Sequence, residues 1–180
     1  MLARDFRQSS RMEMKVAVSQ VMHMVIAATS YNMGLIACSM SKSQEARRAK
    51  ELYTGDLFKK SRRYLELMGV RYVILSAKLG VIEPEEIICP YECTLNEMDF
   101  IARQGWAQKV ASRIQEIEPR GGKLLILAPK RYREFASYLP AQKYELEAPL
   151  AGKRIGQQQA WLKHQIQLLQ SPATILGVEQ

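Results

Sequence analysis

Three short, continuous apolar segments constrain the fold of this chain more than any other feature of its sequence. They lie at residues 35–38, 72–75 and 124–127, and small, polar or basic residues follow each of them. Runs of this length are typical of strands buried on both faces, as in parallel sheets. The sequence therefore predicts an α/β fold, namely a three-layer α/β/α domain with a mainly parallel central sheet of about four strands.

The remaining elements are predicted from helical periodicity and from residues that end helices. Helices are expected at 43–53, 55–68, 95–118, 132–139 and 155–169, and an edge-like strand at 143–147. Gly69 is expected to end the second of these helices. The core face of the long helix at 95–118 is predicted to contain Ile101, Val110, Ile114 and Ile117.

The length fits a single domain. The chain has 180 residues, of which 47% are apolar, which is enough for one sizeable core. We expect an N-terminal extension at 1–33, one α/β domain at 34–170 and a tail at 171–180. No window approaches the ~20 uninterrupted apolar residues of a membrane span, because polar residues interrupt the longest candidate, residues 21–38. A cytoplasmic protein without a membrane partner is expected, and the sequence indicates no oligomeric state.

The formal net charge of +8 favours polyanionic partners such as nucleic acid, although an excess of basic residues also serves solubility. Acidic side chains outnumber basic ones between residues 67 and 119, and basic ones outnumber acidic ones on both sides of that segment. We expect any polyanion-binding surface to combine the helix near 43–66 with the last third of the chain. The alternative is a solvated basic face that binds no partner.

Three loops that follow predicted strands place a basic residue beside small or hydroxyl residues. They are 38–42, 76–80 and 128–131, and their lysines are Lys42, Lys78 and Lys130. Because the carboxyl ends of parallel strands meet at one edge of a sheet, these loops are expected to lie together. Backbone N–H groups and ammonium groups suit a phosphate or another anion. The alternative is that these lysines only solvate the ends of the loops.

The sequence lacks the common catalytic and nucleotide-binding motifs. It contains no P-loop, no dinucleotide-binding glycine motif, no Gly-x-Ser-x-Gly and no His-Glu-x-x-His. Its two histidines, His23 and His164, are poorly placed as bases for a Ser or Cys nucleophile. Cys89 and Cys93 have no second Cys pair to complete a zinc site, and the acidic residues at 83–86 are typical of a solvated turn. We therefore expect no metal and no cofactor.

Several short motifs follow one another in a specific order along residues 34–162. They are Cys-Ser-Met-Ser-Lys at 38–42, Leu-Tyr-Thr-Gly at 52–55, Leu-Ser-Ala-Lys-Leu-Gly-Val-Ile-Glu-Pro at 75–84, Pro-Tyr at 90–91, Pro-Leu-Ala-Gly at 149–152, Ile-Gly-Gln-Gln at 155–158 and Trp-Leu at 161–162. In this order the motifs resemble the YaaA-type proteins. They are still more similar to a small domain family related to that group, whose members open with a strand ending in Cys-Ser-x-x-Lys.

This resemblance implies an α/β/α domain similar to the uracil-DNA glycosylase type and a link to nucleic acids and modified bases. YaaA-like proteins bind DNA, and related domains accompany enzymes that modify bases in tRNA and DNA. Larger YaaA-like proteins also carry a helix-hairpin-helix insertion, but the segment between Tyr53 and Ser76 is too short to hold one. The resemblance therefore does not imply that this chain binds duplex DNA through a helix-hairpin-helix.

The motif residues also make physical sense as a pocket for a base or a nucleotide. Tyr53 and Tyr91 can supply stacking surfaces, each worth about 1 to 3 kcal/mol per base, while Lys42 and Lys78 can reach phosphate. Alternatively, Tyr53 caps a helix end and Tyr91 braces the turn at Pro90. The predicted ligand-binding residues are Cys38, Ser39, Lys42, Tyr53, Thr54, Gly80 and Gln158. The predicted catalytic residues are Ser76, Lys78, Tyr91 and Asp56.

We expect a domain that recognises nucleic acid, a nucleotide or a base, and that acts on a modified base or an N-glycosidic bond if it is an enzyme. Such hydrolysis needs a carboxylate near the sugar, and Asp56 and Glu92 are the only acids adjacent to the motif residues. One alternative is a non-catalytic DNA- or RNA-binding protein that acts in stress or in phage conflict. A second alternative is a protein-interaction domain whose basic charge is incidental.

Overall fold

A computed structural model of the chain describes residues 30–170 and has a five-stranded central sheet in the order β4-β3-β1-β6-β7. The strands of this sheet are β1 (Met33–Ala37), β3 (Tyr72–Ser76), β4 (Gly80–Ile82), β6 (Gly122–Leu127) and β7 (Tyr144–Glu147). The helices are α2 (Ala49–Leu52), α3 (Asp56–Met68), α4 (Phe100–Ile117), the 3-10 segment η1 (Lys130–Tyr138) and α5 (Ile155–Gln170). Two short strands, β2 (Arg47–Arg48) and β5 (Ile87–Ile88), form a separate sheet.

The central sheet is mainly parallel, as predicted, and β1 lies in its middle. Leu35 of β1 pairs with Val73 of β3 on one side and with Ile126 of β6 on the other. β7 pairs in parallel with β6, whereas β4 is antiparallel to β3. The chain first leaves β1 toward β3 and later returns to the opposite side of β1. The carboxyl ends of β1 and β6 therefore flank the point where the strand order reverses, which is where open sheets of this kind bind ligands.

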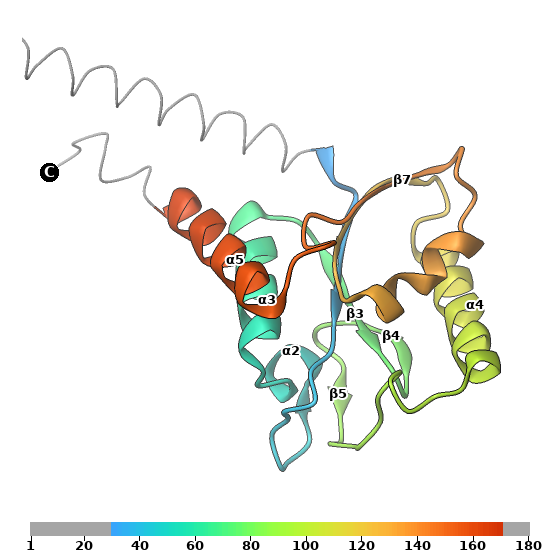
Figure 1. Ribbon diagram of the computed structural model, residues 1–180, viewed down its shortest axis with the longest axis horizontal. Helices are drawn as coiled ribbons and strands as arrows, with labels where there is room; N and C mark the ends of the chain where they lie inside the picture. Colours follow the sequence, from blue (N-terminus) through green and yellow to red (C-terminus); the bar gives the residue numbers. More distant parts are fainter. Residues whose placement is uncertain (1–29, 171–180) are drawn as a thin grey trace, which may run out of the picture.

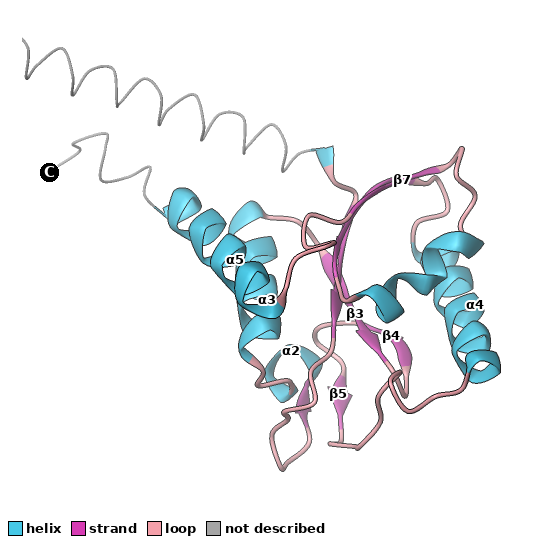
Figure 2. Ribbon diagram, in the orientation of Figure 1, coloured by secondary structure: helices cyan, strands magenta, loops and turns pink. Residues whose placement is uncertain are grey.

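Helices cover both faces of the sheet, which gives the expected three layers (Figures 1 and 2). On one face, Ile36 and Ile74 pack in a core with Leu65 of α3 and with residues of α5. On the other face, Leu35 packs in a core with Ile114 of α4 and with residues of η1. Because successive side chains of a strand point to opposite faces, each buried strand must be apolar throughout. This double burial explains why the three apolar segments of the sequence identify β1, β3 and β6.

The end of α3 and the start of α4 follow from their capping residues. Gly69 ends α3 as predicted, with a φ of 67° that favours glycine. α4 begins only at Phe100, because the carboxylate of Asp99 accepts a hydrogen bond from the N–H of Ala102 at 2.8 Å. The predicted start near residue 95 was therefore too early. Ile101, which was predicted in the core, lies in the first turn of α4 and is 78% exposed.

The prediction was least accurate for residues 43–53 and 80–91. A helix was expected over the whole of 43–53, but only α2 is helical, and β2 precedes it. β4 and β5 lie in a segment for which no strand was predicted. Gly80, with a φ of 77°, begins β4 as the chain turns back along β3. These strands have only two or three residues, which is too short for a periodic pattern to identify them.

None of the helices described within residues 30–170 is long and apolar enough to cross a membrane. Residues 1–29 and 171–180 lie outside the described part of the chain, and His23 is among them. The extension predicted at 1–33 and the tail predicted at 171–180 therefore fall largely or wholly outside it. The proposed domain limits, including 34–170 for the α/β domain, stay predictions.

Candidate functional site

The carboxyl edge of the sheet joins segments that follow three parallel strands. Cys38 directly follows β1, Ser76 is the last residue of β3, and Tyr132 lies in η1 after β6. The Sγ atom of Cys38 lies 3.4 Å from the hydroxyl of Tyr132, so this contact spans the gap between the ends of β1 and β6. The reversal point of the sheet is therefore lined by a thiol and a phenol.

Three buried hydroxyl groups lie in a row beside this point, and we call them the hydroxyl cluster: Tyr53, Ser76 and Tyr91. The hydroxyl of Tyr91 lies 2.6 Å from that of Tyr53 and 2.5 Å from Oγ of Ser76. The N–H of Leu79 donates to the same Oγ at 3.0 Å. Because all three side chains are buried, their hydrogen bonds satisfy polar groups that water cannot reach. The cluster thus fixes the ring of Tyr91 against the end of β3.

The ammonium groups of two lysines lie over the ring of Tyr91. The ammonium group of Lys42 is 4.7 Å from the ring centroid, and that of Lys78 is 5.4 Å from it. Ammonium groups at this distance are attracted to the electron-rich face of an aromatic ring. Within residues 30–170 neither lysine forms an ion pair, although Lys42 donates a hydrogen bond to the carbonyl of Met40 at 3.1 Å. Two cations from separate loops thus converge without a counter-ion.

The loop that carries Lys42 is held in place by hydroxyl and backbone contacts. Oγ of Ser39 donates to the carbonyl of Ser41 at 2.7 Å and accepts from the N–H of Gly55 at 3.2 Å. The N–H of Thr54 donates to the same carbonyl, and Lys42 pairs with Tyr53 in an isolated bridge. A Cβ atom at Gly55 would lie 2.7 Å from Cβ of Ser39, so this close approach needs glycine. Ser39, Thr54 and Gly55 therefore position the lysine and the hydroxyl cluster.

Burial keeps the phenols of this region neutral. It raises the pKa of Tyr91 to about 12, and it also raises the pKa of Tyr53 and of Tyr132. At neutral pH these phenols are therefore hydrogen-bond donors and acceptors without charge. The positive charge of the site comes from the lysines alone.

These shifts predict a loss of stability at high pH. The pKa of Tyr64 and of Tyr91 rises from 10.0 in the unfolded chain to about 12 in the folded one, in both cases mainly through burial. Below about pH 10 both states hold these protons, and above it the unfolded chain releases them first. The free energy of unfolding should therefore fall as the pH rises from about 10 to 12. Urea unfolding at a series of pH values would measure this, and an unchanged free energy across that window would contradict it.

Burial changes the role expected for the two tyrosines. Tyr53 is only 1% exposed, packs edge-on against Tyr91 and lies tilted against Phe58, so its ring is not open to a base. Tyr91 is 8% exposed, and Lys42 and Lys78 lie over it. Both rings belong to the core under α2 and α3. The stacking role predicted for them is therefore not available in this structure, and they instead support the two lysines.

Three other predicted site residues form side-chain or backbone contacts that do not involve the tyrosines of the hydroxyl cluster. The carboxylate of Asp56, at the start of α3, faces solvent and forms an ion pair with Lys60. The amide of Gln158, in the first turn of α5, donates to the carbonyl of Lys153, which precedes that helix, at 2.7 Å. Gly80 serves the turn from β3 to β4, where it pairs with Ser76. None of these contacts assigns a catalytic or ligand-binding role.

The basic segment at 43–66 is largely neutralised by nearby acids. Arg48 and Lys50 pair with Glu85, and Arg62 pairs with Glu66. In the loop at 128–131, the guanidinium of Arg131 donates to the carbonyl groups of residues 95 and 96. Counting charges along the sequence therefore overstated the free positive charge of these segments.

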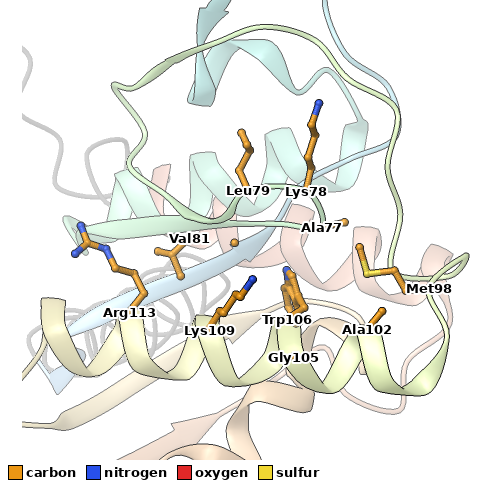
Figure 3. Close-up of a pocket in the computed structure, with 11 residues that line it drawn as sticks. Ala77, Lys78, Leu79, Val81, Met98, Ala102, Gly105, Trp106, Lys109 and Arg113 are labelled. Carbon is orange, nitrogen blue, oxygen red and sulfur yellow. The ribbon is translucent and has the colours of Figure 1, made fainter.

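A groove lies between the β3–β4 hairpin and α4, and we call it the α4 groove. Its volume is about 740 Å³, and its basic lining residues are Lys78, Lys109 and Arg113 (Figure 3). Trp106 lies in this groove, and its indole N–H donates to the carbonyl of Ser76 at 2.8 Å. The same residue of β3 thus contacts the hydroxyl cluster through its side chain and the groove through its backbone.

A comparison with known protein families identifies the family of this chain. The model of a family of unknown function, DUF6884, matches residues 33–164. The chain belongs to this family. The match runs from β1 into α5, so this DUF6884 domain includes the hydroxyl cluster, both lysines over Tyr91 and the α4 groove. A search of curated proteins finds no match to the chain.

The sequence interpretation missed several residues that line this edge of the DUF6884 domain. Tyr132, which contacts Cys38, and the groove residues Trp106, Lys109 and Arg113 were not predicted. One signal was present: Gly105, Lys109 and Arg113 are spaced by four, which places them on one face of a helix. The overall acidic composition of 67–119 obscured this basic stripe.

Among residues 30–170 of the DUF6884 domain, no three side chains of His, Cys, Asp or Glu lie close enough together to hold a metal ion. Cys38 and Cys93 are partly buried free thiols, and Cys89 is an exposed one. Besides these thiols, the described site brings together ammonium groups and neutral hydroxyls, which can attract an anion and form hydrogen bonds.

Proposed function

We propose that this DUF6884 domain binds nucleic acid or a nucleotide at the carboxyl edge of its sheet, with Lys42 and Lys78 contacting phosphate. One observation carries the proposal: two ammonium groups from separate loops lie over Tyr91 without a carboxylate partner within residues 30–170. Two cations held near each other repel, and an anion between them removes that repulsion while forming charge-assisted hydrogen bonds. A phosphate group has the charge and the acceptor oxygens for this role.

The order of motifs supports nucleic acid as the source of that phosphate. Lys42 and Lys78 belong to the segments in which the chain resembles the YaaA-type proteins, which bind DNA. The net charge of +8 also favours association with a polyanion. We therefore infer that phosphate contacts at this edge anchor a strand, and that the neutral hydroxyls of the buried cluster keep the anchoring lysines in position.

The contacts favour binding over cleavage of an N-glycosidic bond. Cleavage needs a carboxylate or a polarised water at the sugar. Asp56 is paired with Lys60 on the surface, and Ser76 and Tyr91 use their hydroxyls in mutual hydrogen bonds. Ser76, Tyr91 and Tyr53 are therefore proposed as positioning residues. Release of free base from oligonucleotides containing uracil, deazaguanine or oxidised bases would contradict a purely binding role.

Fluorescence anisotropy of labelled oligonucleotides at several salt concentrations tests the proposal. We expect binding of a single-stranded oligonucleotide that weakens as salt rises, with a logarithmic slope of about −1.5 for two phosphate contacts. A duplex of the same sequence is measured in parallel, so that the affinities for single-stranded and double-stranded nucleic acid can be compared. Absence of binding to either oligonucleotide at low salt would reject the nucleic-acid proposal and would favour the alternative of a protein-interaction domain.

A further inference from the structure

The α4 groove has the size and shape of a small-molecule site. Its volume of about 740 Å³ lies in the range of about 300 to 1,000 Å³ that is common for ligand pockets. The β3–β4 hairpin forms one wall and α4 forms the other (Figure 3). The groove therefore lies between two rigid elements, which suits a preformed site.

Small residues on both walls keep the groove open. Ala77 and Gly80 lie on the hairpin side, and Ala102 and Gly105 lie on α4. Leu79, Val81 and Met98 add apolar surface to the same walls. A flat, apolar group can enter between walls of this kind, and the thioether of Met98 can pack against its ring.

Gly105 is the most informative of these small residues. It lies inside α4, where glycine costs about 1 kcal/mol relative to alanine. A Cβ atom added at this position meets no heavy atom within 4 Å, so packing does not require glycine. Its φ also lies outside the range that favours glycine. The absence of a side chain at Gly105 instead leaves space in the groove.

Positive charge lies along the same helix face. Lys109 and Arg113 follow Gly105 at successive spacings of four, and Figure 3 places them toward one end of the groove, with Ala102 and Met98 toward the other. Within the described residues Lys109 forms no ion pair, and the ion pair of Arg113 with Glu116 is exposed. An apolar end and a cationic end together suit a ligand with a flat ring and an anionic group.

We propose that the α4 groove binds a nucleoside phosphate, with the base between Gly105 and the hairpin and the phosphate at Lys109 and Arg113. The inference rests on the proposed function, because it deepens nucleotide binding by assigning a second site on the same molecule. Lys78 lies between the two sites: the residue lines the groove, whereas its ammonium group lies over Tyr91, and Figure 3 shows its side chain pointing away from α4. The ligand is either a free nucleotide or one nucleotide unit of a strand anchored by Lys42 and Lys78.

Trp106 provides a local reporter for this site. The chain contains two tryptophans, so replacing Trp161 with phenylalanine leaves Trp106 as the single fluorophore of this type. Trp106 lines the groove and is 7% exposed, which makes its emission sensitive to a base that enters beside it. We expect adenosine 5′-monophosphate to quench the Trp161→Phe protein saturably. Adenosine without phosphate should bind about tenfold more weakly or worse, the loss expected for one charge-assisted hydrogen bond.

Two glycine variants test the location. Gly105→Leu fills the groove while placing a better helix former in α4, so it should fold normally and lose the quenching by adenosine 5′-monophosphate. Gly156→Leu is its matched control, because Gly156 also lies in a helix, has room for a side chain with no heavy atom within 4 Å of an added Cβ, and is far from the groove in sequence. The control should bind as the parent does. Equal quenching in the parent and in Gly105→Leu would overturn the inference.

A second measurement separates this inference from the proposed function. Oligonucleotide binding by anisotropy reports the Lys42 and Lys78 site, whereas Trp106 quenching reports the groove. If the oligonucleotide binds but neither it nor the mononucleotide quenches Trp106, the groove inference fails and the proposed function stands. If the mononucleotide quenches Trp106 and no oligonucleotide binds, strand binding fails and the groove holds a free nucleotide. Competition between the two ligands for Trp106 would support a nucleotide unit of a strand in the groove.

Discussion

Replacing Lys42 and Lys78 together with glutamine should weaken binding of a single-stranded oligonucleotide by about a hundredfold or more at low salt. Each lysine is expected to contribute one charge-assisted contact worth about 1.5 kcal/mol or more, and 1.4 kcal/mol corresponds to a tenfold change in affinity. The plot of the logarithm of affinity against the logarithm of salt concentration should also become less steep, by about 1.5 in slope, because two phosphate contacts are lost. Anisotropy titrations at several salt concentrations measure both effects.

The double variant needs a control for net charge. Lys59→Gln combined with Lys163→Gln removes the same charge from exposed positions on α3 and α5. This control should bind within about threefold of the unmodified protein, since distant surface charges are screened at moderate salt. If both double variants lose affinity equally, the basic charge acts as a diffuse coat and the site over Tyr91 is wrong. Neither variant should unfold, because none of the four lysines is buried and none forms an ion pair within residues 30–170.

The parts of the fold that could be predicted are those in which burial dictates a long pattern. β1, β3 and β6 are covered on both faces, so each is a continuous apolar run that no other element would explain. The start of α4 could not be predicted in the same way. The sequence placed this start near Leu95, but the guanidinium of Arg131 binds the carbonyl groups of residues 95 and 96. A contact across 35 residues is not encoded in local periodicity.

The position of the site followed from topology, whereas the role of each residue did not. Because Lys42 and Lys78 both follow parallel strands, the sequence placed them at the same edge, where both lie over Tyr91. The sequence could not indicate that Tyr53 would be buried or that Asp56 would pair with Lys60. Those outcomes depend on the direction in which a side chain leaves the backbone and on neighbours distant along the chain. Topology therefore predicted which residues lie together, but not the contacts that each side chain makes.

Trp106 links stability to the proposed ligand sites, and its removal should have the largest effect on folding. The side chain packs in the core between the sheet and α4, contacts Tyr132 edge-on with ring centroids 5.6 Å apart, and donates to the carbonyl of Ser76. Trp106→Ala should therefore lower the free energy of unfolding by about 3 to 5 kcal/mol, the range for truncation of a large buried aromatic residue. Urea unfolding followed by circular dichroism measures this loss.

Two further variants separate volume from hydrogen bonding at this position. Trp106→Phe keeps most of the apolar contact but leaves the carbonyl of Ser76 without its indole donor, which should cost about 1 to 3 kcal/mol. Trp161→Ala is the comparison, because Trp161 is only partly buried where it meets Tyr64, and its truncation should cost less than half as much as Trp106→Ala. Equal losses for the two alanine variants would mean that Trp106 is not the central packing residue of its face.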